Sequence, residues 1–338
     1  MTRSRQHLVF DVGGTQLRAA VYDQASESLT GVSRVDAPSY LRHADASWPD
    51  LRARLIDDMS ELRRRVDPHE GIPTAVVAFP GPVDSEHRVV AAPPLWGTRG
   101  RYPYSLEPDL RERWPGTDVC VVNDVTAAGY RYVRASNDDF CIVTISSGIG
   151  NKVFVRGRPL VGRSGQGGEI GHLQVDGSPT APTCDCGGRG HLAAIASGRG
   201  MLVRARDRAV KDRDFSSSML CDRMHLTASG LTSEALAIAY VEGDPWATTV
   251  VREGAGALGS VLATIHLAIG IDRFVLIGGL ALGLGQRFCR DVRAGLHARC
   301  WRGESDADSD AISVILGDTD GHCALVGAGR ARHLGLLP

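Results

Sequence analysis

An Asn–Asp pair closes an apolar run at a point where the chain could do acid–base chemistry. Val119–Val122 is typical of a buried strand, and Asn123 and Asp124 follow it directly in the segment NDVTAAGYRY. A carboxylate at the end of such a strand can accept the proton of a substrate hydroxyl. The same carboxylate could instead cap the helix that VTAAGYRYV predicts, because Asp is a preferred N-cap residue. The pair alone predicts either a general base or a cap.

Three turns of small residues could hold phosphate groups. They are DVGGTQLR at 11–18, SSGIG at 146–150 and IGGLALGLG at 277–285. Glycines in such turns let backbone N–H groups approach an anion closely, and the third turn leaves room for a flat apolar ligand such as adenine. Asp11, buried at a strand end beside the first turn, could hold water on Mg²⁺. Three such turns favour a nucleotide more than any one of them would.

A group of Cys and His residues has the spacing of a metal site. Glu169 and His172 lie three residues apart, on one face of a helical turn, and the segment CDCGGRGH follows them. Cys184, Cys186 and His191, together with His172, would supply two thiolates and two imidazoles, a set that suits tetrahedral Zn²⁺. The pattern therefore predicts a closed zinc site, with unrelated free thiols as the alternative.

The composition is that of a globular protein. The 338 residues are 43% hydrophobic and 23% charged, and the formal net charge of −1 gives no reason to expect nucleic acid or an anionic membrane as partner. Only Lys152 and Lys211 are lysines, so no Gly-Lys-Ser/Thr phosphate loop exists. No apolar run approaches the roughly 20 residues of a membrane span, and the N-terminus lacks a signal peptide's apolar segment. We therefore expect a cytoplasmic protein whose eight cysteines are mostly reduced.

The elements that must position these residues repeat along the chain. Residues 7–23 predict an apolar strand, the first glycine turn and a second strand, and residues 140–162 repeat this order around the second turn. Two such units predict a duplicated α/β architecture with a cleft between the halves. The chain is also long enough for about two domains.

Other segments have clear local patterns. Residues 48–66 and 230–268 carry apolar residues at helical spacing, which predicts helices. Residues 74–84 predict a buried strand that ends in a Pro-Gly turn. Residues 302–310, RGESDADSD, predict an exposed loop.

Together these motifs resemble those of the ROK family of sugar kinases and repressors, within the sugar kinase/Hsp70/actin superfamily. The resemblance covers nearly the whole chain. Asp11–Thr15 resembles the family's first phosphate motif and Ser146–Gly150 its second. Gly168–His172 matches the ROK signature, and CDCGGRGH resembles the family's zinc motif. Any one of these motifs would be weak evidence, but their combination is highly specific.

The resemblance implies a fold and a division of the chain. The implied fold is α/β, the actin-like or Hsp70-like ATPase fold, with two duplicated domains and an active-site cleft between them. A small N-terminal domain would span residues 1–123, with a C-terminal helix near 323–338 packed back on it. A large domain with the zinc-binding loop would span residues 124–322.

The resemblance also implies roles for individual residues. Asp124 would be the catalytic base of an ATP-dependent phosphoryl transfer to a sugar hydroxyl, with Mg²⁺ spreading the phosphate charge. A structural Zn²⁺ would bind His172, Cys184, Cys186 and His191. The expected substrate-binding residues are Gly81, Asn123, Asp124, Glu169 and His172. The expected nucleotide-binding residues are Asp11, Gly13, Gly14, Thr15, Gln16, Ser146, Ser147, Gly148, Gly278 and Gly279.

The acceptor side departs from the family pattern. Pro94 stands where the family usually has a sugar-contacting Asn, and Ala193 stands where it usually has a sugar-contacting Glu. The last zinc ligand is His191 instead of Cys, and Asn151 and Lys152 interrupt the run of glycines after the second phosphate turn. Each lost hydrogen bond is worth about 1 kcal/mol net. We therefore expect an amino sugar or a C7 cyclitol of antibiotic biosynthesis as acceptor in preference to glucose, with phosphorylation on a primary hydroxyl.

Alternatives stay open from the sequence. If the Pro94 and Ala193 substitutions are silent, the protein is an ordinary glucokinase. A repressor of the same family would carry an N-terminal helix-turn-helix, whereas only ten residues precede Asp11. A non-catalytic sugar-sensing regulator is permitted by the lost pocket residues, although the retained Asp124 and phosphate turns argue against it. We expect a homodimer with no nucleic-acid or membrane partner.

Overall fold

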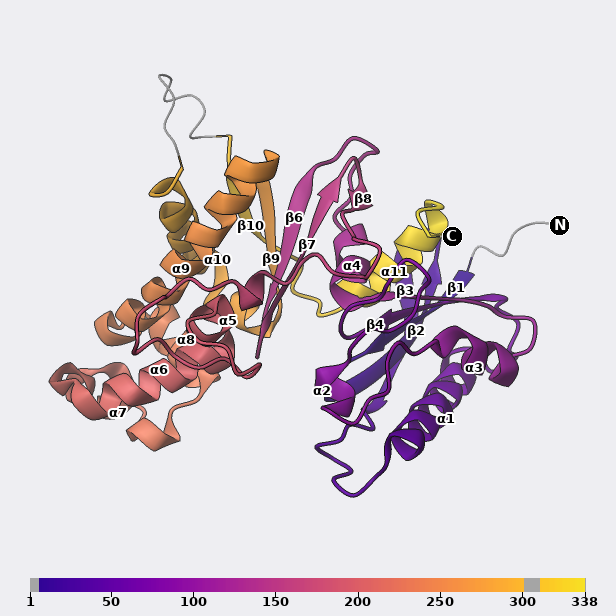
Figure 1. Cartoon of the computed structure of the whole chain (residues 1–338), viewed down its shortest axis with the longest axis horizontal. Helices are drawn as coiled ribbons and strands as arrows, with labels where there is room; N and C mark the ends of the chain where they lie inside the picture. Colours follow the sequence, from indigo (N-terminus) through magenta and orange to yellow (C-terminus); the bar gives the residue numbers. More distant parts are fainter. Residues whose placement is uncertain (1–5, 301–310, 338) are drawn as a thin grey trace. The chain divides into compact units, whose positions relative to one another are not determined.

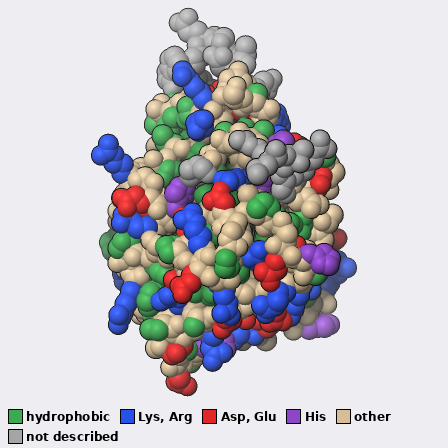
Figure 2. All heavy atoms as spheres, turned by 90° about the vertical axis from the view of Figure 1, so that its right-hand side faces the viewer, with side chains coloured by type: hydrophobic (Ala, Val, Ile, Leu, Met, Phe, Trp, Pro, Cys, Tyr) green, Lys and Arg blue, Asp and Glu red, His purple; other side chains and the backbone are tan. Residues whose placement is uncertain are grey.

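The computed structural model describes residues 6–300 and 311–337. The exposed loop predicted at 302–310 lies outside these residues. On the face that Figure 2 draws, basic and acidic side chains are interspersed. Among the described residues, none of the helices combines the length and the apolar character that crossing a membrane requires.

The chain divides into two compact units. Unit 1 comprises Met1–Asp138, Phe154–Gly167 and His322–Pro338, and unit 2 comprises Asp139–Val153 and Gly168–Gly321. The expected boundary after residue 123 differs from this division, because the helix that follows residue 123 stays with the first unit.

The sheet of unit 1 has five strands in the order β3-β2-β1-β4-β5 (Figure 1). Three of them, β1 (Gln6–Val12), β2 (Gln16–Asp23) and β3 (Ser28–Asp36), form an antiparallel meander. The other two, β4 (Thr74–Phe79) and β5 (Asp118–Asn123), extend the sheet parallel to β1. The parallel strands are buried almost throughout, which explains why they are nearly continuous apolar runs in the sequence.

The parallel strands of unit 1 bring three candidate segments to one edge of the sheet. In the register, Asp11 of β1 lies opposite Ala78 of β4, and Phe79 of β4 lies opposite Asn123 of β5. Because parallel strands share a direction, the first glycine turn, the Gly81 turn and Asp124 all follow strand ends on the same edge.

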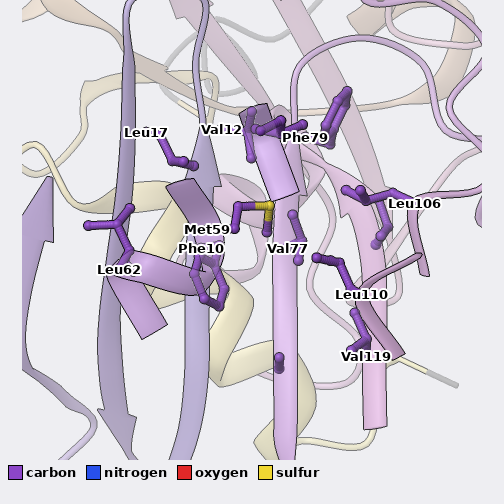
Figure 3. Close-up of a cluster of buried hydrophobic side chains, with 14 of the residues drawn as sticks. Phe10, Val12, Leu17, Met59, Leu62, Val77, Phe79, Leu106, Leu110 and Val119 are labelled. Carbon is purple, nitrogen blue, oxygen red and sulfur yellow. The ribbon is translucent and has the colours of Figure 1, made fainter. Parts of the chain in front are cut away.

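Helix α1 (Trp48–Val66) forms as predicted and covers the sheet of unit 1. Ser47 and Asp50 make a capping box at its start, and its apolar residues at helical spacing are buried. Figure 3 shows Met59 of this helix near Phe10 of β1 in the core. The remaining helices of unit 1 are α2 (Pro93–Trp96), α3 (Leu106–Arg113), α4 (Asp124–Tyr130) and α11 (Cys323–His333). Helix α11 packs against β1, β4 and α4.

The second five-stranded sheet has the order β10-β9-β6-β7-β8 (Figure 1). Read from β8, this is the order of unit 1: an outer strand, a turn-linked pair, then two later strands. The later strands β9 and β10 run parallel to β6, as β4 and β5 run parallel to β1. This repetition confirms the predicted duplicated α/β architecture. The strands are β6 (Phe140–Ile145), β7 (Ile149–Val155), β8 (Arg158–Pro159), β9 (Arg273–Ile277) and β10 (Ser313–Leu316).

Residues 230–268 are largely helical as predicted, and the chain forms two helices there, α8 (Ser233–Val241) and α9 (Pro245–Ile269). Gly243 has φ +88°, which ends the first helix, and Asp244 caps the second by accepting the Ala247 N–H at 2.7 Å. The third small-residue turn is shorter than predicted, since Gly278 caps a helix that begins at Gly279. The helices of unit 2 are η1 (Ile170–His172), α5 (Leu192–Ala196), α6 (Gly198–Lys211), η2 (Arg213–Ser217), α7 (Met219–Asp222), η3 (Ala228–Gly230), α8 (Ser233–Val241), α9 (Pro245–Ile269) and α10 (Gly279–His297).

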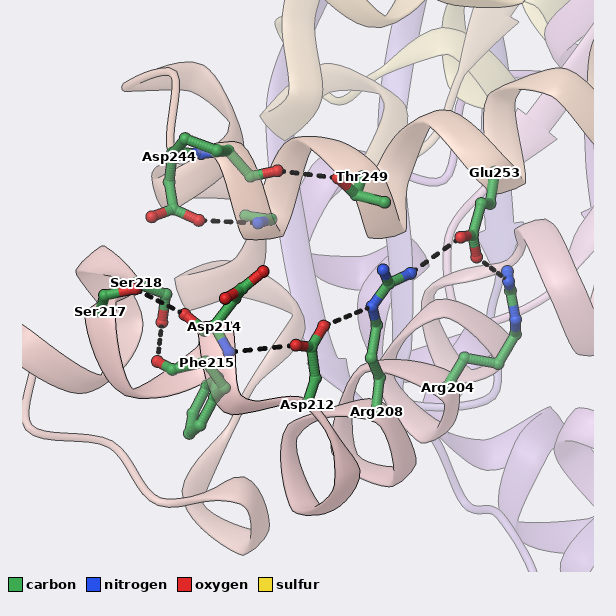
Figure 4. A network of polar contacts seen from close by, with 12 residues as sticks. Arg204, Arg208, Asp212, Asp214, Phe215, Ser217, Ser218, Asp244, Thr249 and Glu253 are labelled. Carbon is green, nitrogen blue, oxygen red and sulfur yellow. Dashed lines mark hydrogen bonds and ion pairs between the residues drawn. The ribbon is translucent and has the colours of Figure 1, made fainter.

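Ion pairs join α6 to α9 (Figure 4). Glu253 of α9 pairs with both Arg204 and Arg208 of α6, and Arg208 also donates to Asp212 at 3.1 Å. A shared carboxylate between two arginines restrains α6 more than an isolated surface pair would. This matters for the site described next, because the start of α6 lines a cavity.

Candidate functional site

Asp124 begins helix α4 directly after strand β5. The residue before it, Asn123, is the N-cap, because Asn123 Oδ1 accepts the Thr126 N–H at 2.9 Å. The interpretation of Asp124 as the helix cap is therefore wrong. Since Asn123 satisfies the helix terminus, the Asp124 carboxyl is not needed for capping.

The Asp124 carboxyl is held in one orientation. Its Oδ1 accepts hydrogen bonds from Asn123 Nδ2 and from the Val125 N–H, both at 2.8 Å. Asn123 Nδ2 also donates to Gly81 O at 2.9 Å. Both Asn123 and Asp124 are half-buried. A general base needs an oriented carboxylate, and these hydrogen bonds provide the orientation.

Gly81 is the backbone support of this pair. Its φ is +100°, and a Cβ at this position would lie 2.0 Å from Ala91 O. A larger residue would therefore displace either the turn or the segment at Ala91. The Gly81 carbonyl is the acceptor that anchors the Asn123 amide, so its effect on Asp124 passes through Asn123.

The first glycine turn is closed and tightly packed. The Gly13 N–H donates to Gln16 O at 2.9 Å, so this amide is already used. A Cβ on Gly14 would lie 2.7 Å from Pro94 O, which means that α2 packs directly on the turn. Pro94, expected from the family pattern at the sugar, therefore also contacts the phosphate turn. Thr15 and Gln16 are exposed at the turn and can face a ligand.

Asp11 lies beside this turn with a cationic partner. The carboxylate is mostly buried, and Arg18, which faces Asp11 across the β1–β2 pair, forms an ion pair with it. Arg18 therefore neutralises part of the Asp11 charge that the sequence led us to expect at Mg²⁺. An acid in this state can orient water on a metal but competes less strongly for direct coordination.

The second and third turns line one cavity in unit 2, of about 460 Å³. Ser146 and Ser147 come from the turn after β6, and Gly279 comes from the start of α10. Gly148 and Gly278 shape the turns instead of lining the cavity: Ser146 N–H donates to Gly148 O at 3.0 Å. A Cβ on Gly278, whose φ is +96°, would lie 2.6 Å from Ile145 O. The cavity is large enough for a nucleoside.

Several residues of this cavity were missed by sequence reasoning. Arg199 follows Gly198 at the start of α6, and its Nε donates to Ser147 O at 3.2 Å. Ser197 caps this helix, so the segment SGRG carried a helix-start signal that could have been read. Nothing in the local pattern of α8 marks it as a cavity wall. The unpredicted lining residues are Gly198, Arg199, Ser233, Glu234, Ala237, Ile238, Leu280 and Gly283.

The four predicted zinc ligands come together. One ligand atom from each of His172, Cys184, Cys186 and His191 lies within 4.8 Å of the others. Cys186 Sγ is 3.3 Å from His191 Nδ1, and Cys184 Sγ is 3.9 Å from His172 Nδ1. Tetrahedral bonds of about 2.0–2.3 Å place ligand atoms roughly 3.3–3.8 Å apart, so the set fits Zn²⁺. Burial raises the pKa of the Cys184 thiol, so a nearby cation is needed for it to ligate as a thiolate near neutral pH.

Glu169 is the residue before the short helix η1, and His172 is its last residue. Both side chains are exposed, whereas Ile170 and Gly171 between them are buried. The His172 N–H donates to Glu169 O at 3.0 Å, which closes the turn. His172 Nδ1 faces the cysteine cluster, so only its other ring nitrogen is open to a substrate.

A second group of metal-ligand types in unit 1 has a structural explanation. Ligand atoms of His87, Glu107 and Cys120 lie within 4.8 Å of one another. However, His87 Nδ1 is 3.0 Å from Val121 O, and Glu107 accepts the Val121 N–H at 3.0 Å. These side chains satisfy the open backbone groups of edge strand β5. Burial raises the pKa of the Cys120 thiol to about 12, which disfavours a thiolate.

Comparison with known proteins identifies the family. The ROK family matches residues 8–328. The chain belongs to the ROK family. It is 36% identical to the C(7)-cyclitol 7-kinase of Streptomyces hygroscopicus subsp. jinggangensis, over 96% of this chain and 92% of that one. It is 34% identical to the 2-epi-5-epi-valiolone 7-kinase of Actinoplanes sp., over 96% and 91% of the two chains.

The fold is that of solved ROK proteins. The ROK hexokinase from Thermus thermophilus aligns with a TM-score of 0.70 at 25% identity, covering 98% of this chain and 99% of that one. The expected family and fold class are therefore confirmed. The roles of the individual ROK site residues stay predictions.

Proposed function

We propose that this ROK protein is an ATP-dependent kinase that phosphorylates the exocyclic primary hydroxyl of a C7 cyclitol or a closely related sugar analogue. The observation that carries the proposal is the Asp124 carboxyl, freed from capping and oriented by Asn123 and Val125. The choice of acceptor is supported by two relatives, at 36% and 34% identity, that are named as kinases of C7 cyclitols.

Asp124 acts as the base in the proposed reaction. The acceptor hydroxyl gives its proton to the carboxylate as its oxygen bonds to the γ-phosphorus of ATP. The bond from that phosphorus to the β–γ bridging oxygen breaks, and ADP leaves. Asn123 and Gly81 keep the carboxyl oriented, and we retain Asn123, Gly81, Glu169 and His172 as acceptor-binding residues.

The nucleotide is assigned to the glycine turns and the unit 2 cavity. Adenosine would occupy the cavity behind Ser146 and Ser147, where Ile238 and Leu280 supply apolar contact. The exposed Thr15 and Gln16 of the first turn would meet phosphate oxygens. Mg²⁺, when bound, neutralises phosphate charge, and Asp11 would orient water on it while sharing its charge with Arg18.

Zn²⁺ has a structural role in the proposal. Its four ligands leave no open coordination position, which is typical of structural zinc. The segment from His172 to His191 would be fixed by the metal, and η1 with Glu169 adjoins that segment. Zinc would therefore hold the Glu169 carboxylate in place without touching the reacting atoms.

Two substitutions favour a cyclitol over glucose. Pro94 has no side-chain donor or acceptor and packs on the Gly14 turn, so the hydrogen bond of the usual Asn is absent there. Ala193, half-buried in α5, supplies no carboxylate. A pocket that lacks these hydrogen-bonding groups discriminates less between acceptors with different ring substituents. The alternative of an ordinary glucokinase predicts the opposite preference.

The remaining features of the proposal are a homodimer and a cytoplasmic location. Light scattering on the purified protein measures the first. The other class of function, a sugar-sensing regulator without catalysis, is consistent with family membership alone. It predicts ligand binding with no transfer of phosphate.

The test is a direct search for product. Purified protein is incubated with ATP, Mg²⁺ and either 2-epi-5-epi-valiolone, glucose, glucosamine or N-acetylmannosamine, and ADP release and phosphate esters are measured. We expect a cyclitol phosphate whose phosphorus couples to the exocyclic methylene protons in NMR spectra. Binding of these acceptors with no phosphorylated product from any of them contradicts the proposed function.

A further inference from the structure

Asn151 of β7 is buried in unit 2 and bonds to the segment that carries Glu169. The residue is 3% exposed. Its backbone N–H donates to Gly168 O at 3.2 Å, and its side-chain Oδ1 accepts the Ile170 N–H at 3.3 Å. Asn151 therefore holds the residue before Glu169 and the residue after it.

The side chain of Asn151 is itself held in place. Its Nδ2 donates toward Cys141 Sγ, in β6, at 3.7 Å. With the amide nitrogen directed toward β6, Oδ1 faces the Ile170 N–H. The asparagine side chain thus adds a hydrogen bond from strand β7 to the start of η1.

The Glu169 segment has no room to shift toward β7. A Cβ on Gly168 would lie 2.1 Å from Asn151 O and 3.0 Å from Lys152 Nζ. A Cβ on Gly171 would lie 2.5 Å from Ile149 O. Because glycines on both sides of Glu169 touch strand β7, the strand determines where the Glu169 backbone lies.

The hydrogen bond between the Asn151 side chain and the Ile170 N–H is not expected from the family pattern. Asn151 interrupts the run of glycines that usually follows the second phosphate turn. A glycine here would keep the N–H bond to Gly168 but would leave the Ile170 N–H, on a residue 8% exposed, without the Asn151 oxygen. The side chain therefore adds a hydrogen bond next to Glu169 where the family has none from this position.

We propose that Asn151 is a positioning residue for acceptor recognition, which sets the direction of the Glu169 carboxylate by bracketing it at Gly168 and Ile170. Its role rests on the proposed function, because Glu169 contacts the acceptor only in that proposal. Asn151 does not touch the acceptor. A small displacement of a binding group can cost roughly 10²-fold in rate, so loss of the Asn151 side-chain hydrogen bond lowers kcat/KM for the acceptor.

The test compares Asn151→Leu, which has the same size but no acceptor atom, with Asn151→Asp, which keeps an oxygen at the Oδ1 position. Ser218→Ala is the matched control: Ser218 is 2% exposed, lies in the same unit, and caps α7 away from the Glu169 segment. Glu169→Gln tests the acceptor role itself. For each protein, kcat, KM for 2-epi-5-epi-valiolone, KM for ATP and Tm are measured.

We expect Asn151→Leu to lower kcat/KM for the cyclitol by roughly 10–100-fold while KM for ATP changes less than about twofold. Asn151→Asp should recover most of that loss, whereas Ser218→Ala should lower Tm alone. Asn151→Gly, which keeps the backbone bond, replaces the Leu variant if that protein does not fold. A cyclitol kcat/KM within twofold of wild type in both the Leu and Gly variants, or a loss shared equally by ATP, overturns the positioning role. Failure of Glu169→Gln to weaken acceptor use would instead contradict the proposed function.

Discussion

The two glycine turns that follow the first strand of each sheet occupy equivalent places but are built differently. In unit 1 the turn after β1 is filled: Gly14 meets α2 at Pro94, and Arg18 neutralises Asp11. In unit 2 the turn after β6 is open: a Cβ on Gly148 would meet no atom within 4 Å, and Ser146 and Ser147 line a cavity. One strand order therefore supports a packed turn in one unit and a turn that lines a cavity in the other.

The two units therefore contribute different features. Unit 1 fixes a carboxyl, because β4 and β5 deliver Gly81, Asn123 and Asp124 to the same sheet edge as the packed turn. Unit 2 supplies space, because the segments between its strands are long enough to add α6 and α8 around the open turn. The duplication thus preserves a scaffold, and the chemistry depends on what is inserted between the repeated strands.

Substituting Asp124 gives the largest expected effect and tests the role proposed for the oriented carboxyl of unit 1. Asp124→Asn keeps Oδ1, which accepts from Asn123 and Val125, so the fold should be retained. General base catalysis contributes roughly 10²–10⁴-fold, and kcat should fall by that factor. Steady-state ADP release and a thermal melt measure both properties.

Asp57→Asn is the matched control, since Asp57 is an exposed carboxylate in the same unit that pairs with Arg113. It should leave kcat unchanged. Turnover of Asp124→Asn within a few-fold of wild type would show that the oriented carboxyl is not the base.

The sequence predicted the elements of unit 1 better than those of unit 2. Helix 48–66 was predictable because a capping box and an apolar stripe agree over its whole length. The break at Gly243 was missed because apolar spacing continues across it, and a cap inside such a pattern is easily read as part of the helix. Local periodicity does not reveal where a long helix divides.

For the site, the sequence found groups that are adjacent in the chain and missed those that meet only in the fold. The zinc set lies within one short segment, so spacing was sufficient to predict it. Asn123 as the cap of α4 was missed because Asn and Asp are both good caps, and the choice between them depends on backbone geometry. The α8 residues of the cavity and the Arg18 partner of Asp11 require strand register or tertiary packing to be known.

Loss of a zinc ligand should affect unit 2 and leave the Asp124 hydrogen bonds of unit 1 unchanged. We expect about one zinc per chain in protein purified without chelator. Cys184→Ala should lose the zinc, lower Tm and reduce kcat/KM for the acceptor by roughly 10–100-fold, because the segment next to Glu169 is no longer fixed. Cys221→Ala, a cysteine outside the cluster, should keep both zinc and activity. Wild-type protein without zinc would refute the metal site.

Acceptor choice tests whether the altered contacts matter. Loss of the two usual polar groups at Pro94 and Ala193 removes about 2 kcal/mol of hydrogen bonding to glucose, or roughly 30-fold. We expect kcat/KM for 2-epi-5-epi-valiolone to exceed that for glucose by at least this factor. Ala193→Glu, which restores a carboxylate, should narrow the gap by improving glucose. A clear preference of the wild-type protein for glucose would mean that both substitutions are silent and that the enzyme is a glucokinase.

The smallest expected effect distinguishes the two glycine turns directly. Gly14→Ala places a methyl group 2.7 Å from Pro94 O, so either α2 or the turn must move, and such overpacking costs about 1–3 kcal/mol of unfolding free energy. Gly148→Ala meets no protein atom within 4 Å, and its cost should stay within about 0.5 kcal/mol. The proposal puts the nucleotide at this second turn, so the added methyl group should raise KM for ATP. Urea unfolding and ATP kinetics on both variants therefore give opposite patterns: Gly14→Ala loses stability, and Gly148→Ala loses nucleotide affinity at nearly unchanged stability. Equal losses of stability in the two variants would mean that the turns are packed alike, and unchanged ATP kinetics in Gly148→Ala would remove the nucleotide from the second turn.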